Sequence, residues 1–179
     1  EHLQLAALYS PVNSSVHQKL GHALLKTNKP EEALRHLLKA VEKQPDTHEL
    51  WEAISEAHQL AGDLNLAMEA AERAVQVDPF AVKARLQAGK VRWTRGELEK
   101  ALDQVNLAIS LDPEDADNYV FMARLLVEQG DKNKALEMLD KAAQSKNATV
   151  QTMIEHASLL SDVKGPAAAR DLIASFTEK

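Results

Sequence analysis

The sequence predicts an all-α protein built from repeated helical hairpins, because several residue types recur at one fixed spacing. The period is 34 residues, and alanine follows it in two series: Ala33, Ala67, Ala101, Ala135 and Ala169, and Ala6, Ala40, Ala74, Ala108 and Ala142. Proline and glycine follow it too, at Pro11, Pro45, Pro79 and Pro113 and at Gly62, Gly96 and Gly130. A fixed period of this length indicates one supersecondary unit copied along the chain. Stacked units of this kind present long recognition surfaces rather than closed pockets.

Each period contains two amphipathic segments, as residues 48–81 illustrate. Apolar residues recur there at helical spacing: Leu50, Ile54, Ala57, Ala61, Ala67, Met68, Ala71, Ala74 and Val75. Gly62 suits the left-handed conformation that ends a helix, and Asp63 suits the cap of the next one. Asp46 and Glu49 predict a capping box before the first segment.

The pattern predicts eleven helices and no strand, since no segment alternates apolar and polar residues with a period of two. The expected ranges are 1–9, 14–27, 30–44, 48–61, 64–77, 82–95, 98–111, 116–129, 132–145, 150–162 and 166–178. Residues 1–13 fall into register with the second half of a unit, so we expect the chain to be part of a longer array.

Composition narrows the function classes. The net charge is −6, with 27 acidic and 21 basic residues, which argues against a general affinity for nucleic acid or anionic lipid. There is no cysteine, so disulfides and thiolate metal sites are absent. No stretch is long and apolar enough to predict a transmembrane helix, and no signal peptide is visible. The sequence favours neither a cytoplasmic nor a periplasmic location.

The 34-residue period and the helix–turn–helix unit resemble the tetratricopeptide repeat family. Leu20-Gly21, Trp51 and its aromatic counterpart Tyr119 occupy positions that the family favours. The resemblance covers a half unit, 1–13, and five units: 14–47, 48–81, 82–115, 116–149 and 150–179. Two departures are Asn147, in place of a unit-closing proline, and Arg92, in place of a large apolar side chain.

The resemblance implies a right-handed superhelix, an α-solenoid, whose first helices line a concave groove. The periodicity identifies one face of each first helix that the alanine series do not need. We take the following residues on that face as candidates for binding a partner protein: Glu52, Glu56, Lys83, Leu86, Lys90, Trp93, Val120, Arg124, Val127 and Ile154.

The main hypothesis is that the apolar candidates receive apolar side chains of a bound peptide or helix. Lys83, Lys90 and Arg124 would then pair with carboxylates of the partner. The alternative is that these residues pack against the next repeat, with Glu52 or Glu56 paired to Lys90. Some family members bind a chaperone's C-terminal carboxylate with a set of lysine, asparagine and arginine residues, which this groove lacks. Glu52 and Glu56 would in addition repel such a carboxylate, so we do not expect this kind of ligand.

No motif predicts catalysis, a cofactor or a metal ion. The seven histidines include His17 and His22, which a spacing of five turns away from each other on a helix. His36, His48 and His156 lack an acidic or histidine neighbour at ligand spacing. No nucleophile elbow, phosphate-binding loop or carboxylate pair is present.

We therefore interpret the chain as a non-enzymatic scaffold that binds a peptide or helix of another protein, within a multiprotein complex. The second hypothesis is an assembly element that stacks or self-associates through its helix ends, for example in a bacterial envelope export or secretion machine.

Overall fold

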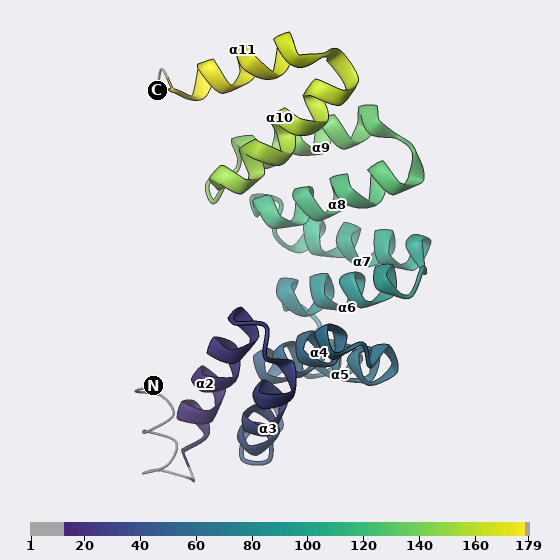
Figure 1. Ribbon diagram of the computed structural model, residues 1–179. Coiled ribbons are helices and arrows are strands. Elements are labelled where there is room, and N and C mark those ends of the chain that lie inside the picture. Colours follow the sequence, from purple (N-terminus) through teal and green to yellow (C-terminus); the bar gives the residue numbers. More distant parts are fainter. Residues whose placement is uncertain (1–12, 178–179) are drawn as a thin grey trace. The chain divides into compact units, whose positions relative to one another are not determined.

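The computed structural model describes residues 13–177, which form an all-α repeat fold of ten helices with no strand in that range (Figure 1). The helices are α2 (Ser14–Lys26), α3 (Pro30–Val41), α4 (His48–Ala61), α5 (Leu64–Val77), α6 (Val82–Thr94), α7 (Leu98–Leu111), α8 (Ala116–Gln129), α9 (Lys132–Gln144), α10 (Val150–Lys164) and α11 (Pro166–Thr177). The helix expected at 1–9 lies outside the described residues.

The chain divides into two compact units at Ala101 and Leu102, a boundary inside α7. In the first unit, here called unit 1, α2 packs on α3 and α4 on α5, and α6 packs on both α5 and α4. In unit 2, α8 packs on α9 and α10 on both α9 and α11. Consecutive helices such as α2 and α3, or α8 and α9, form helical hairpins (Figure 1).

A left-handed residue ends the first helix of the hairpins, as the glycine series predicts. Gly62, Gly96 and Gly130 have φ values of 87°, 77° and 91°. Asn28 stands one period before Gly62 and has a φ of 55°, so asparagine takes the glycine's place in the hairpin of α2 and α3. Asparagine tolerates this conformation better than most residues, because its short side chain can hydrogen-bond locally.

The capping box predicted before α4 is absent, whereas Asp63 occupies the N-cap position of α5 as predicted. The N-cap residue of α4 is Thr47, which makes no side-chain cap bond, so Asp46 and Glu49 form no capping box. Asp63 stands at the N-cap of α5 without a side-chain cap bond. Asp131, its counterpart two periods later, accepts a hydrogen bond from the Lys134 backbone N–H at 3.1 Å.

The helix boundaries differ most from expectation at α3 and α10. Helix α3 ends at Val41 rather than 44, and α10 continues to Lys164 rather than 162. Gly165, the C-cap of α10, has φ 92° and ψ 164°, which is outside the left-handed helical region. The last hairpin therefore turns differently from the others, and the 34-residue pattern cannot locate its turn.

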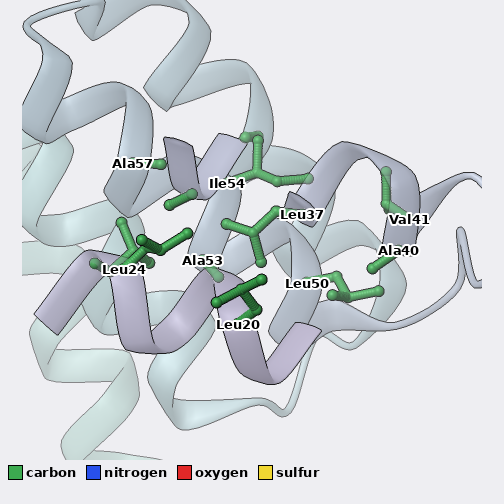
Figure 2. Packing of buried hydrophobic residues seen from close by; sticks show 12 residues of the cluster. Leu20, Leu24, Leu37, Ala40, Val41, Leu50, Ala53, Ile54 and Ala57 are labelled. Atoms are coloured by element: carbon green, nitrogen blue, oxygen red, sulfur yellow. The ribbon is translucent and has the colours of Figure 1, made fainter. Parts of the chain in front are cut away.

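The alanine series mark the most buried positions of the fold. Ala33, Ala67, Ala101 and Ala135 have no exposed surface, and neither do Ala40, Ala74, Ala108 and Ala142 in the second series. In unit 1, leucine, isoleucine and valine side chains from α2, α3 and α4 fill the space around these alanines (Figure 2). The small methyl groups allow the helices to approach closely, and the branched side chains supply most of the buried apolar area.

Gly21 marks a close contact between α2 and α3. A Cβ placed on Gly21 would lie 2.5 Å from Cδ2 and 2.6 Å from Cγ of Leu37, a side chain with no exposed surface. Leu37 projects from α3 toward α2, where Figure 2 shows it beside Leu20. The glycine is needed here for space, because the backbone of α2 passes directly over Leu37.

A hydrogen bond to a proline carbonyl recurs three times along the chain, at intervals of one 34-residue period. The Trp51 Nε1–H donates to the Pro45 carbonyl at 2.7 Å, and the Tyr119 hydroxyl donates to that of Pro113 at 2.9 Å. Between them, the Arg85 guanidinium donates to the Pro79 carbonyl at 2.9 and 2.6 Å. All three donors stand six residues after their proline, so this position selects a long side chain with an N–H or O–H group rather than an aromatic ring.

The next repeat of this pattern differs at both the proline position and the donor position. Asn147 replaces the proline, and Met153, which has no strong donor, stands where Trp51, Arg85 and Tyr119 stand in the other repeats. The Asn147 carboxamide accepts from the Ala116 backbone N–H at 2.8 Å and donates to Asp115 at 2.7 Å. Asn147 therefore binds the start of α8 to the loop before α10.

We expect the substitution Gly21→Ala to change sign with the size of residue 37. In the wild type it should destabilise unit 1 by about 1 kcal/mol, since overpacking costs about 1–3 kcal/mol and outweighs a helix-propensity gain of at most about 1 kcal/mol. In a Leu37→Ala background the clash is absent, and the same substitution should stabilise. Urea unfolding followed by tryptophan fluorescence, from Trp51 and Trp93 of unit 1, measures both effects. Equal stabilisation in the two backgrounds would contradict the close contact.

Candidate functional site

The candidate residues of unit 1 lie on one face of its first helices, α4 and α6. Glu49, Glu52 and Glu56 recur along α4 at helical spacing, and Lys83 and Lys90 do so along α6. Helices α2, α4 and α6 are neighbours, because α4 packs on each of the other two. We call this surface, with His22 and Lys26 of α2 and Trp93 of α6, the charged face of unit 1.

A buried polar network holds α4 and α6 in register beneath this face. The Gln87 amide N–H donates to Ser55 Oγ at 3.2 Å and to Gln59 Oε1 at 3.1 Å. Ser55 Oγ in turn donates to the Ala67 carbonyl at 2.8 Å, and Gln59 Nε2 donates to Thr94 Oγ1 at 2.6 Å. Since an unsatisfied polar group in the interior is costly, this network favours a single register of α6 on α4.

Glu52 is tied to its own helix rather than to Lys90. Its Oε1 lies 2.9 Å from Nδ1 of His48, one turn earlier, and only 15% of its side chain is exposed. Burial raises the pKa of Glu52, and the hydrogen bond from His48 opposes that rise. The spacing of four residues could have predicted the pair, so the interpretation of His48 as lacking an acidic neighbour is wrong.

The remaining charged candidates of unit 1 are exposed. Glu56, Lys83 and Lys90 reach solvent, and none of them forms an ion pair with another residue of the described range. The alternative pairing of Glu56 with Lys90 is therefore not formed. Trp93, one turn after Lys90, is half-buried.

Charges from α2, α4 and α6 together influence the pKa of His22. Burial lowers the pKa of His22. The nearby carboxylates of Glu56 and Glu49 oppose that effect, whereas the cations Lys26 and Lys83 add to it. The charged face therefore has mixed sign over a short distance.

Two apolar candidates are not available on the surface. Leu86 is 5% exposed and Val120 is 9% exposed, so the expectation that they lie open on a groove is wrong. Periodicity places both residues on the first-helix face, but it does not show how much of that face neighbouring side chains cover. Both residues contribute to the core.

In unit 2, Arg124 is paired with Glu155 across α8 and α10. The guanidinium donates to both carboxylate oxygens, with Nε at 2.9 Å and a terminal nitrogen at 2.5 Å. This bidentate contact raises the pKa of Arg124 and lowers that of Glu155. Glu155 thus neutralises much of the charge that Arg124 would offer a partner carboxylate. Val127 and Ile154 remain open to solvent, at 38% and 55% exposed.

The sequence analysis missed two further histidine contacts. Nδ1 of His17 and Nδ1 of His36 lie 2.9 Å apart across the α2–α3 hairpin, with the rings stacked. His156 is buried, and its Nε2 lies 3.2 Å from Asp140 of α9. Only helix packing, within the α2–α3 hairpin for the first pair and between α9 and α10 for the second, brings these residues together, because 19 and 16 positions separate them in the chain.

Within residues 13–177, no group of three acidic or histidine side chains is arranged to hold a metal ion. No helix in the same range combines the length and apolar character needed to cross a membrane.

The fold and this face define a helical-hairpin repeat protein with an open, charged surface. Family models described as tetratricopeptide repeat match residues 19–79, 57–116 and 116–149. The chain therefore belongs to the tetratricopeptide repeat family. Members of this family are generally protein–protein interaction scaffolds and typically not catalysts. A search of curated protein sequences finds no significant match.

Solved structures show the same fold at low sequence identity. A tetratricopeptide repeat protein of Thermus thermophilus is 22% identical with a TM-score of 0.80, covering 88% of this chain and 87% of its own. PilF of Pseudomonas aeruginosa is 20% identical with a TM-score of 0.77, covering 92% and 75%. YrrB, described as having an unusual peptide-binding site, is 14% identical with a TM-score of 0.60, covering 97% and 90%.

We expect stability to fall on acidification before the carboxylates titrate. Burial lowers the pKa values of His22, His36 and His156 from 6.5, with the charge of His17 lowering that of His36 further. As the pH falls, the histidines of the unfolded chain are therefore protonated before those of the folded chain. The free energy of unfolding is at its full value above pH 6.5 and decreases as the pH falls toward the histidine pKa values of the folded state. The raised pKa of Glu52 acts in the opposite direction.

Urea midpoints measured from about pH 7 to about pH 5 test this linkage. The wild-type midpoint should decrease over that interval, and His36→Gln should make the decrease shallower. An unchanged slope in His36→Gln would show that His36 does not contribute.

Proposed function

We propose that the chain binds a segment of a partner protein on the charged face of unit 1. The observation that carries the proposal is that Glu56, Lys83 and Lys90 are exposed and form no ion pair within residues 13–177, beside the half-buried Trp93. Exposed charges around a tryptophan are a common composition of binding hot spots. The scaffold role of the family and the peptide-binding site described for YrrB support the same interpretation.

The mode of binding follows from the rigidity of the surface. The network of Gln87, Ser55 and Gln59 fixes α4 against α6, so little conformational entropy is lost when a partner docks. Trp93 would provide the apolar contact, and the charges of Glu56 and Lys90 would select and orient the segment. Val127 and Ile154 are candidate apolar contacts of unit 2.

We expect Trp93→Ala to reduce the affinity for a partner by about tenfold or more, since buried tryptophan anchors dominate binding energies. Lys90→Gln should have a smaller effect that is strongest at low salt. Quantitative pull-down followed by titration calorimetry measures both. Lys39→Gln, an exposed lysine of α3 away from the face, is the matched control. Unchanged capture by both Trp93→Ala and Lys90→Gln would refute the proposal, and a lower melting temperature for Trp93→Ala would favour a packing role.

The second candidate function is self-association through the last hairpin. Val150, Ile154 and Ile173 leave more than half of their surface exposed on α10 and α11. Large apolar side chains exposed on the last hairpin favour contact with another protein surface.

We expect Ile154→Lys to abolish such association, because an ammonium group buried without a partner is costly. Analytical ultracentrifugation over a concentration series measures it, with Lys141→Gln as an exposed control on α9. A monomer at every concentration would exclude this candidate.

A further inference from the structure

The charges on α4 and α6 change sign at equivalent positions of successive repeats. Glu49 and Lys83 are one 34-residue period apart, and so are Glu56 and Lys90. All four side chains are exposed, and α4 packs directly on α6. Two neighbouring helices therefore present parallel rows of opposite charge, acidic on α4 and basic on α6.

We propose that the charged face of unit 1 binds an extended partner segment in which a basic and an acidic side chain stand three residues apart, the basic one toward α4 and the acidic one toward α6. This inference rests on the proposed function and specifies the chemistry of its ligand.

The mixed charge of the face excludes a segment of one sign. Glu49, Glu52 and Glu56 would repel an acidic segment that crosses α4. Lys83 and Lys90 would repel a basic segment that crosses α6. Juxtaposed like charges at an interface cost several kcal/mol as an order of magnitude, so a segment with both signs in the right order is selected.

The spacing of three residues follows from the distance between packed helices. Helix axes in contact lie about 8–10 Å apart. In a polyproline II segment every third side chain points the same way and the rise is about 3.1 Å per residue, so positions i and i+3 are separated by about 9 Å on one side. In a β-strand the nearest positions on one side are about 7 Å apart, which spans the two rows less well.

The intramolecular contacts of the described residues leave Glu56 and Lys90 open, whereas the Glu49 carboxylate lies 3.4 Å from Nε2 of His48. Glu52, between the two exposed glutamates, is hydrogen-bonded to His48 and does not pair with α6. The side chains of Gln59 and Thr94 join the helices at the end of the face, through a bond of 2.6 Å. The charges of Glu56 and Lys90 are therefore left for an external ligand.

A random-sequence peptide display library, selected against the whole chain, tests the proposal. We expect peptides that bind the wild type but not Trp93→Ala, and these should be enriched in a basic and an acidic residue at spacing three. Synthetic versions of one such peptide with the same composition but spacing two should bind about tenfold more weakly, equivalent to about 1.4 kcal/mol.

Charge variants of the protein provide the matched control. Glu56→Lys and Lys90→Glu should each weaken binding of the peptide in which a basic residue is followed by an acidic one. The double variant, with both charges exchanged, should recover affinity for a peptide in which the basic and acidic residues are interchanged. Circular dichroism and tryptophan fluorescence verify that each variant is folded.

The outcomes separate this inference from the proposed function. Peptides that need Trp93 but show no charge pattern or no spacing preference would overturn the inference and leave the proposed function standing. A library that yields no peptide sensitive to Trp93→Ala or Lys90→Glu would overturn both.

Discussion

The structure depends on the close approach of helices at alanine. Eight alanines of the two series, from Ala33 to Ala142, have no exposed surface, so each repeat offers its neighbour only a methyl group at the closest contact. Larger side chains would separate the helices, and the branched residues around them would lose contacts in a densely packed interior. At Gly21 even a methyl group would be too large, because Leu37 already fills the space that a Cβ would need. These positions cannot vary much, so differences between repeats must appear elsewhere.

The buried polar network between α4 and α6 is one such difference, and it bears on recognition. Gln87 is the centre of the network and is buried, so its hydrogen bonds to Ser55 and Gln59 have to be satisfied. An apolar contact would tolerate sliding of one helix along the other, whereas this network fixes one register. Glu56 and Lys90 are thereby held at a defined separation on the surface above it. A fixed separation lets a surface distinguish ligands by the spacing of their charges.

The sequence predicted the fold well because backbone turns and close helix contacts each demand a particular residue type. Glycine at 62, 96 and 130 and alanine at the contacts are local requirements that leave a visible period. Other features depend on contacts that periodicity does not contain. Leu86 shares its periodic position with Glu52, and only the packed structure shows it as core. Asn147 departs from the proline pattern, and its bonds to Ala116 and Asp115 become evident only when the repeats are placed together.

The sign change between Glu56 and Lys90 contributes little to the stability of the fold. Both side chains are exposed and neither forms an ion pair with the rest of the described chain. Exposed charges contribute little to folding, typically below about 1 kcal/mol even when they are paired. The scaffold would therefore accept either sign at either position at nearly equal stability. By contrast, charges at these positions decide which ligands the face attracts and which it repels. The charges at positions 56 and 90 can therefore be adapted to a ligand without altering the fold of unit 1.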